Sequence, residues 1–197
     1  VNLSIQTSSC KGWQGGRYQP GGTCTGAIDT WASRIVEKEE DPIRLGRWSS
    51  IKVQIKGTEI VFITAYRPCK SQINTEVTTS YAQQWRDLVG EKTRVDPRSK
   101  MLEDLKKTIK TEKEKGSEIV LMIDANESAD ARKEEITGMI QECGLVDAHL
   151  MNDPFSNIET YVRGKGKIDY IFTTPKIQQS ITYSHITPYH EWIISDH

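Results

Sequence analysis

The sequence predicts a single domain, residues 1–197, folded as a layered α/β sandwich around mixed sheets. Short turns join β-rich runs in the first half, which indicates antiparallel pairs. Amphipathic helical stretches separate the apolar runs of the second half, which indicates crossover connections. Strands and helices alternate irregularly, so a regular β-α-β-α winding is not expected. A chain of 197 residues is long enough for one domain with a core of ordinary size.

The first half is predicted to form strands. Hydrophobic residues alternate over Val1–Ile5, and a further strand is expected to begin at Gly21-Gly22-Thr23 and to run to Trp31. Ser49–Lys56 and Glu59–Tyr66 are expected to pair antiparallel around a tight turn at Gly57-Thr58.

The second half is predicted to alternate between helices and strands. The expected helices span Tyr81–Glu91, Ser99–Lys115 and Ala131–Cys143, and the expected strands span Glu118–Ile123, Ile168–Thr173 and Ile181–Thr187. Gly144 follows the third helix and is expected to cap its C-terminus.

Composition narrows the classes of protein that fit. The chain is 36% hydrophobic and 27% charged, and no apolar run approaches the roughly 20 residues of a membrane span. No signal peptide is recognisable, and the start at Val1 indicates an internal segment of a longer protein. Several common enzyme motifs are absent from the sequence, namely GxSxG, the P-loop, GxGxxG and HExxH.

Net charge and cysteine spacing say less about the partners and the metal or disulfide content of the protein. A net charge of −1 offers no overall electrostatic case for a nucleic-acid partner. Arg163, Lys165 and Lys167 form a local basic cluster that either contacts a polyanion or is an ordinary solvated surface. The four cysteines are widely spaced, which disfavours a zinc site or a disulfide framework and predicts free thiols: Cys10, Cys24, Cys69 and Cys143.

A polar motif follows directly on the apolar run Ile119–Ile123. Asp124 and Asn126 are two apart, so in an extended chain they point the same way. A carboxylate there can orient a water molecule while the amide donates to a substrate oxygen. The alternative is structural, because the same residues form Asx turns and helix N-caps.

Other polar residues occur at further expected strand ends. Asp169 lies inside a β-rich run, where a carboxylate needs a cationic partner, a metal ion or a structural salt bridge. Asp196-His197 joins a hard oxygen ligand to an imidazole, although a chain end is often frayed. Tyr66 ends a strand and can donate to a phosphate, or pack with its hydroxyl in water. We expect these strand ends to meet at one polar cleft.

The order of these sites resembles the endonuclease/exonuclease/phosphatase superfamily. A Tyr at a strand end, an apolar strand running into DxN, the segment IDYIF and the terminal SDH occur in that order from about Gly21 to His197. The resemblance implies a four-layer α/β sandwich of two mixed, mostly antiparallel sheets flanked by helices. It also implies a phosphodiesterase that uses Mg²⁺, with Mn²⁺ as a substitute.

The same resemblance implies a role for each residue. Asp124 would orient or deprotonate the attacking water, and Asn126 would hold that water or the scissile phosphate, to which Tyr66 would donate. His197 would bind a phosphate oxygen and stabilise the transition state, and Asp169 would orient its imidazole. Asp196 would bind the metal ion.

Three segments are most similar to the endonuclease domains of retroelement reverse-transcriptase polyproteins: 18–23, 45–49 and 65–67. This version implies DNA as the substrate, no membrane partner and an intracellular, nuclear location. The family's metal-binding Glu has no counterpart before Glu37, although Asn2 stands in a setting that could mimic the family's upstream Asn. The family's last strand would follow His197. We therefore expect a fragment truncated at both ends, and whether it keeps activity stays open. Two alternatives stay open: a phosphatase or phosphodiesterase for inositol phosphates or lipids, and a non-catalytic remnant of the fold.

Overall fold

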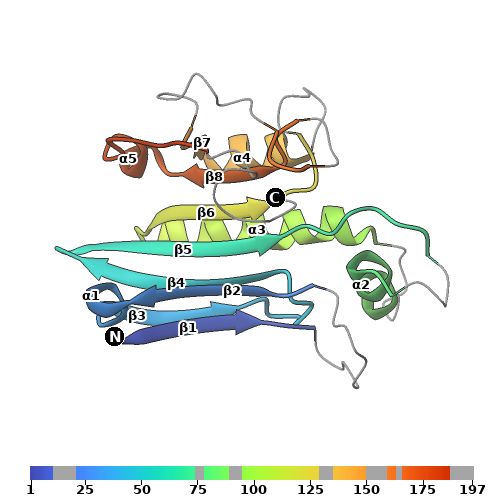
Figure 1. The fold of residues 1–197 in the computed structure, drawn as a ribbon, viewed down its shortest axis with the longest axis horizontal. Coiled ribbons are helices and arrows are strands. Elements are labelled where there is room, and N and C mark those ends of the chain that lie inside the picture. Colours follow the sequence, from blue (N-terminus) through green and yellow to red (C-terminus); the bar gives the residue numbers. More distant parts are fainter. Residues whose placement is uncertain are drawn as a thin grey trace.

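A computed structural model describes residues 1–10, 21–73, 78–88, 95–128, 135–149, 159–162 and 166–186 (Figure 1). The strands are β1 (Leu3–Ser8), β2 (Thr23–Ile28), β3 (Ile35–Glu40), β4 (Trp48–Ile55), β5 (Thr58–Tyr66), β6 (Glu118–Asp124), β7 (Val146–Asp147) and β8 (Asp169–Thr173). The helices are α1 (Asp29–Ala32), α2 (Ser80–Leu88), α3 (Pro97–Glu114), α4 (Glu135–Cys143) and α5 (Pro175–Gln178).

Six strands form one mixed sheet, in the order β3-β4-β5-β6-β8-β7. Only the β5–β6 pair is parallel among these neighbours, because α2 and α3 carry the chain back between the two strands. The other pairs are antiparallel, as expected for hairpins and short returns. The sheet therefore confirms the predicted mixed and mostly antiparallel arrangement.

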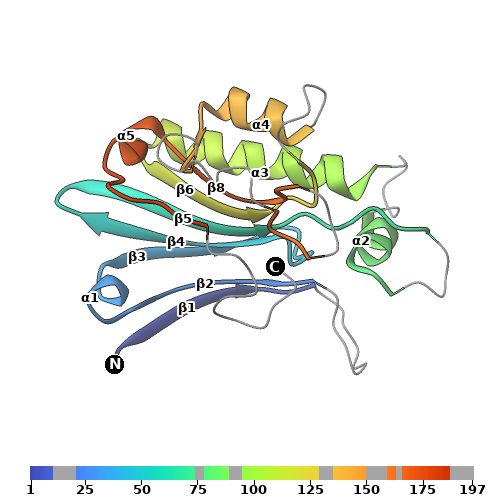
Figure 2. The same cartoon turned by 45° about the horizontal axis from the view of Figure 1, so that its top comes forward.

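Helices α3 and α4 cover one face of this sheet (Figure 2). The α3 residues that enter the core recur at helical spacing, which explains why this segment forms an amphipathic helix: Met101, Leu102, Leu105 and Ile109. Asp96 caps the helix, since its Oδ1 accepts a hydrogen bond from the Arg98 backbone N–H at 2.7 Å. Among the described residues, no helix combines the length and the apolar character needed to cross a bilayer.

The hairpin of β1 and β2 lies against the opposite face of the sheet, beneath β3 and β4 in Figure 2. Its contact with the large sheet is partly polar, because Thr25 Oγ1 lies 2.8 Å from the Ser49 carbonyl oxygen and 2.9 Å from Ser49 Oγ. Its outer face is apolar and open, with Leu3, Ile5 and Ile28 exposed by 63%, 47% and 56%. The two sheets and the helical layer confirm the α/β sandwich class.

The local predictions are mostly confirmed, with two corrections. The β4–β5 hairpin turns where expected, and Gly144 ends α4 with φ +59°, in the left-handed region. The strand predicted to reach Trp31 stops at Ile28, because the chain turns into α1 at Asp29. A strand over Ile181–Thr187 is wrong for its described part: residues 181–186 pair with no strand, and Tyr183 is 76% exposed.

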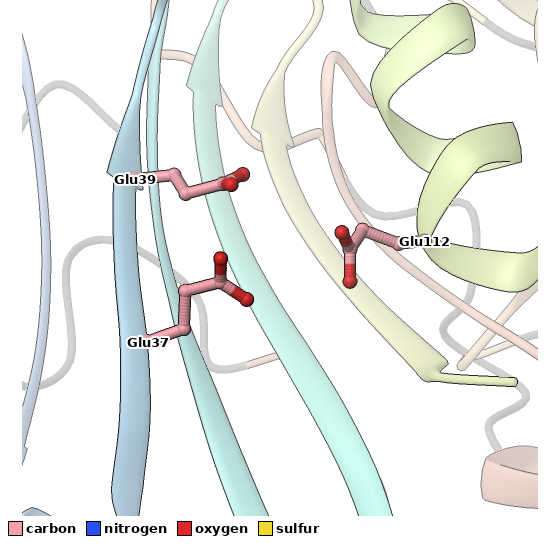
Figure 3. A group of neighbouring side chains, drawn as sticks. All are labelled: Glu37, Glu39 and Glu112. Carbon is pink, nitrogen blue, oxygen red and sulfur yellow. The ribbon is translucent and has the colours of Figure 1, made fainter. Parts of the chain in front are cut away.

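A partly buried ion network joins β3 and β4 to α3, and Figure 3 shows its three carboxylates, Glu37 and Glu39 on β3 and Glu112 on α3. Lys52 Nζ lies 2.8 Å from Glu112 Oε2 and 2.5 Å from Glu37 Oε2, and Glu39 completes the acidic group. Burial alone would raise the pKa of Glu112, but the hydrogen bonds from Lys115 and Lys52 outweigh it and hold that pKa below its usual value. Because two of these carboxylates pair with the buried ammonium group of Lys52, the group is a structural link rather than an open cation site.

This network makes a pH-dependent contribution to stability. Because the folded-state pKa of Glu112 is lowered, its stabilisation is present above the ordinary pKa of 4.5 and is lost as the pH falls below it. Glu112→Gln is therefore expected to lower the free energy of unfolding at pH 7 by up to about 3 kcal/mol. The difference from the parent chain should shrink as urea unfolding is repeated at acidic pH.

Glu142→Gln is the matched control, because Glu142 pairs with Lys106 and Lys110 on an exposed helix surface. It should leave the free energy of unfolding close to that of the parent chain, because solvent screens an exposed ion pair. A loss for Glu112→Gln that stays constant down to acid pH would contradict the ionic explanation.

Candidate active site at the strand ends

Strand register brings three of the predicted residues side by side. Tyr66 on β5 pairs with Asp124 on β6, and Asp124 pairs with Asp169 on β8. Directly paired residues of neighbouring strands project to the same face of a sheet. All three are partly exposed, whereas the adjoining residues on the other face, including Ala65 and Ile123, are buried under the helices.

The chain bends sharply after Asp124. Asp124 Oδ1 accepts a hydrogen bond from the Asn126 backbone N–H at 3.0 Å, which is an Asx turn. Asn126 has φ +48°, in the left-handed region that asparagine tolerates better than most residues. The structural alternative for this motif is therefore present in the structure, and it holds the Asp124 carboxylate at the strand end.

The side chain of Asn126 is fixed from two sides. Its Nδ2 donates to the Arg67 carbonyl oxygen at 2.7 Å, and its Oδ1 accepts from the Cys69 thiol at 2.6 Å. These contacts use one of its two amide hydrogens and one acceptor position of its oxygen. Burial raises the pKa of Cys69, and the nearby Asp124 carboxylate raises it further, so the thiol stays protonated and able to donate.

Arg67 joins the ends of β5 and β6 to α4. Its backbone N–H donates to the Asp124 carbonyl oxygen at 2.9 Å. Its buried side chain pairs with Glu127 through Nη1 and with Glu135 through Nη2, the latter at 2.5 Å. Glu127 in turn accepts from the Ile136 backbone N–H at 3.3 Å. The loop after Asp124 is thus held by both backbone and charge.

A second arginine holds the same loop from α3. Arg98 donates to the carbonyl oxygens of Pro68, at 2.7 Å, and Asn126, at 3.2 Å. Burial, and then the neighbouring Arg67, lower the pKa of Arg98, but an arginine keeps its proton under such shifts. The two arginines therefore hold the loop after Asp124 from the β5 end and from α3.

The segment before β8 is anchored separately. Thr160 Oγ1 accepts hydrogen bonds from the backbone N–H groups of Ile168, at 3.0 Å, and Asp169, at 3.1 Å. Lys167 is buried, and its Nζ lies 2.7 Å from Asp147 Oδ2. The prediction that Lys167 belongs to a basic surface cluster is therefore wrong, because Lys167 is buried and Asp147 compensates its charge. Arg163 and Lys165 lie outside the described residues.

The predicted set is therefore only partly placed. Tyr66, Asp124, Asn126 and Asp169 meet at one edge, whereas Asp196 and His197 lie outside the described residues. Sequence reasoning missed the supporting residues Arg67, Arg98, Cys69 and Thr160. A signal was available for Arg67 alone, because a charged side chain directly after a central apolar strand requires a buried partner.

Three solved structures show the same arrangement of elements. One is the endonuclease domain of TRAS1, a telomere-specific non-LTR retrotransposon, with a TM-score of 0.58 and 16% identity over 99% of this chain. The second is an AP endonuclease from Archaeoglobus fulgidus, with a TM-score of 0.52 and 18% identity over 90% of this chain. The third is the 3′ phosphatase NExo from Neisseria, bound to a product DNA hairpin, with a TM-score of 0.52 and 14% identity over 90% of this chain.

The chain has the endonuclease/exonuclease/phosphatase fold. It spans 75% of the TRAS1 chain, 68% of each of the other two, and about 60% of further chains with this fold. No family model matches the sequence, and no curated protein matches it. The likeness therefore concerns the fold, and the roles of the strand-end residues remain predictions.

The contacts of Arg67 predict that its replacement lowers the free energy of unfolding and loosens the loop after Asp124. Arg67→Met removes the buried cation that pairs with Glu127 and is expected to lower the free energy of unfolding by about 3–5 kcal/mol. Hydrogen exchange should show faster exchange at Asn126 and Ile136 than in the parent chain. Arg67→Lys should restore little, because one ammonium group cannot pair with two separated carboxylates as the planar guanidinium does.

Arg44→Met provides the control, since the Arg44 side chain is exposed and contacts Glu40 at 3.5 Å on the surface. It should leave both the unfolding free energy and the exchange at Asn126 close to the parent values. Equal effects from the Arg44 and Arg67 variants would rule out that the buried ion pairs of Arg67 hold this loop.

Proposed function

We propose that this protein is a metal-dependent phosphodiesterase that acts on DNA. The observation that supports it most is the register Tyr66–Asp124–Asp169, which aligns a phenol and two carboxylates across three neighbouring strand ends. These are the groups that hydrolysis of a phosphodiester requires: a carboxylate for the water, a donor for the phosphate, and a carboxylate that orients an imidazole.

Each of the strand-end residues has its own role in the proposed reaction. Asp124 orients the attacking water and accepts its proton, and the Asx turn keeps that carboxylate at the open end of β6. Tyr66 donates its phenolic hydrogen to the scissile phosphate. Asn126 directs its second amide hydrogen toward the water or the phosphate, since Arg67 and Cys69 fix its other groups.

Asp169 and His197 act together in the proposal. His197 binds a non-bridging phosphate oxygen and stabilises the charge that grows there in the transition state. Asp169 accepts the other ring N–H of the imidazole and so selects its tautomer and orientation. Asp169 is a positioning residue in this scheme, because it acts through His197 and does not touch the phosphate.

The strand-end chemistry fits a divalent cation. Carboxylates in direct register on neighbouring strands repel each other, so positive charge near Asp124 and Asp169 is favourable. Mg²⁺ prefers oxygen ligands and is commonly held by one or two carboxylates together with substrate phosphate. Asp196 would hold it here, and the bound ion would neutralise charge on the phosphate.

DNA is the substrate that we propose. The TRAS1 domain, the AP endonuclease and the DNA-bound 3′ phosphatase support it, since these proteins share the fold. The test compares nicking of supercoiled plasmid with release of phosphate from inositol phosphates, each with Mg²⁺, with Mn²⁺ and with EDTA. Nicking that requires the metal is expected. Phosphate release without nicking would favour the inositol or lipid alternative, and neither activity would favour a non-catalytic remnant.

Asp124→Asn is expected to lower the nicking rate by at least about a hundredfold, because an amide cannot accept the proton of the water. Circular dichroism and the unfolding midpoint should stay close to those of the parent chain, since an amide oxygen can still accept in the Asx turn. Glu118→Gln changes a carboxylate at the opposite end of the same strand and should leave nicking unchanged. Full activity in the Asp124 variant would refute its assigned role.

Asp169→Asn should lower nicking less than Asp124→Asn, because it disturbs the imidazole and not the water. Its effect should depend on His197: in a His197→Ala background, Asp169→Asn is expected to cause little further loss. The measurement is a double-mutant cycle on the nicking rate. Additive losses would show that Asp169 acts independently of the imidazole.

A further inference from the structure

A small hollow opens directly beside Tyr66, at the start of α2. Its volume is about 240 Å³, and we call it the Tyr66 hollow. Its lining comes from the end of β5, the following loop and the first turn of α2: Tyr66, Cys69, Ser71, Thr78, Thr79, Ser80 and Tyr81. Two of these residues, Tyr66 and Cys69, also belong to the strand-end site.

The lining is neutral and rich in hydroxyl groups. Among the described residues it contains no lysine, arginine, aspartate or glutamate. A second phosphate would be recognised by cationic side chains, and an acyl chain by an apolar wall, so the hollow suits neither. Hydroxyl groups that donate and accept suit an uncharged polar group, and the two phenol rings add flat surfaces.

The walls of the hollow are held in place. Ser71 Oγ and Thr79 Oγ1 lie 2.6 Å apart, and the Ala82 backbone N–H donates to Thr79 Oγ1 at 3.3 Å. Cys69, which also lines the hollow, is held by its hydrogen bond to Asn126. A group seated between these walls lies next to Tyr66, the proposed phosphate donor.

We propose that the Tyr66 hollow binds the nucleoside adjacent to the scissile phosphate. This inference rests on the proposed function and names the part of the substrate that this site selects. In a nucleic acid every phosphodiester is flanked by uncharged sugar and base groups. The sugar and base edges meet the hydroxyl lining while the attached phosphate reaches the Tyr66 phenol. A volume of about 240 Å³ is below the usual range for drug-sized ligands and suits a single nucleoside.

Cys69 provides a direct probe of this site that does not depend on catalysis. Alkylation of the full chain with N-ethylmaleimide at about pH 9 is followed by mass spectrometry of the Cys69 and Cys24 peptides. Both thiols are exposed, and only Cys69 lines the hollow, so Cys24 on β2 is the internal control. Thymidine 5′-monophosphate should slow alkylation of Cys69 and leave Cys24 unaffected. Inorganic phosphate and inositol 1-phosphate at the same concentration should not.

Two variants at Thr78 test the lining. Thr78→Val removes a hydroxyl group and should raise the concentration of thymidine 5′-monophosphate that gives half protection by about threefold to tenfold. Thr78→Trp fills the hollow and should abolish protection. Thr58→Val makes the same isosteric change at the far end of β5 and should leave protection at the parent value.

The outcomes separate this inference from the proposed function. Equal protection by inorganic phosphate, or none by the nucleotide, overturns the nucleoside site even if the protein nicks plasmid. Stronger protection by inositol 1-phosphate than by the nucleotide also overturns it. Selective protection by the nucleotide supports the nucleoside site, and it does so even where nicking is absent and the catalytic proposal fails.

Discussion

The parallel pairing of β5 with β6 is the constraint on which the strand-end site depends. Parallel neighbours end at the same edge of a sheet, so Tyr66 and Asp124 arrive together only because a helical crossover separates their strands. The antiparallel β8 then begins at that edge and adds Asp169. A shift of one residue in either pairing would turn one of these side chains toward the helices.

Arg67 and Arg98 tie this edge of the sheet to the buried interior of the protein. Arg67 connects the β5 end to the Asp124 carbonyl and to Glu135 at the start of α4, while Arg98 reaches the same loop from the start of α3. A change in how α3 and α4 lie on the sheet would therefore move Asn126. The helical layer thus contributes to the geometry of the carboxylates as well as to burial of the sheet.

Much of this organisation could be predicted from the sequence, because it depends on local patterns. The β4–β5 turn, the amphipathic face of α3 and the apolar β6 ending in Asp124-x-Asn126 all rest on spacing within a few residues. The order of the polar sites then indicated that strand ends meet. These signals are strong because burying the wrong residue in a central strand carries a large free-energy cost.

The rest depends on contacts between distant parts of the chain, which spacing does not encode. Nothing around Lys167 indicates that its partner is Asp147, twenty residues earlier in the chain, so an exposed cluster was the natural expectation. Ile181 and Tyr183 alternate as in a strand, yet no strand edge pairs with them among the described residues. The partners of Arg67 lie 60 and 68 residues away, so they become recognisable only in the fold.

The β1–β2 hairpin has its polarity reversed, with hydroxyl groups against the large sheet and aliphatic side chains outward. A ribbon of two strands is marginal by itself, so this one depends on its hold on β4. Its outer row of Leu3, Ile5 and Ile28 exposes apolar surface. Among the described residues each strand of the hairpin has one strand neighbour, so its other edge can pair with a further strand. At high concentration this protein should consequently self-associate through that surface rather than through the strand ends that carry Asp124 and Asp169.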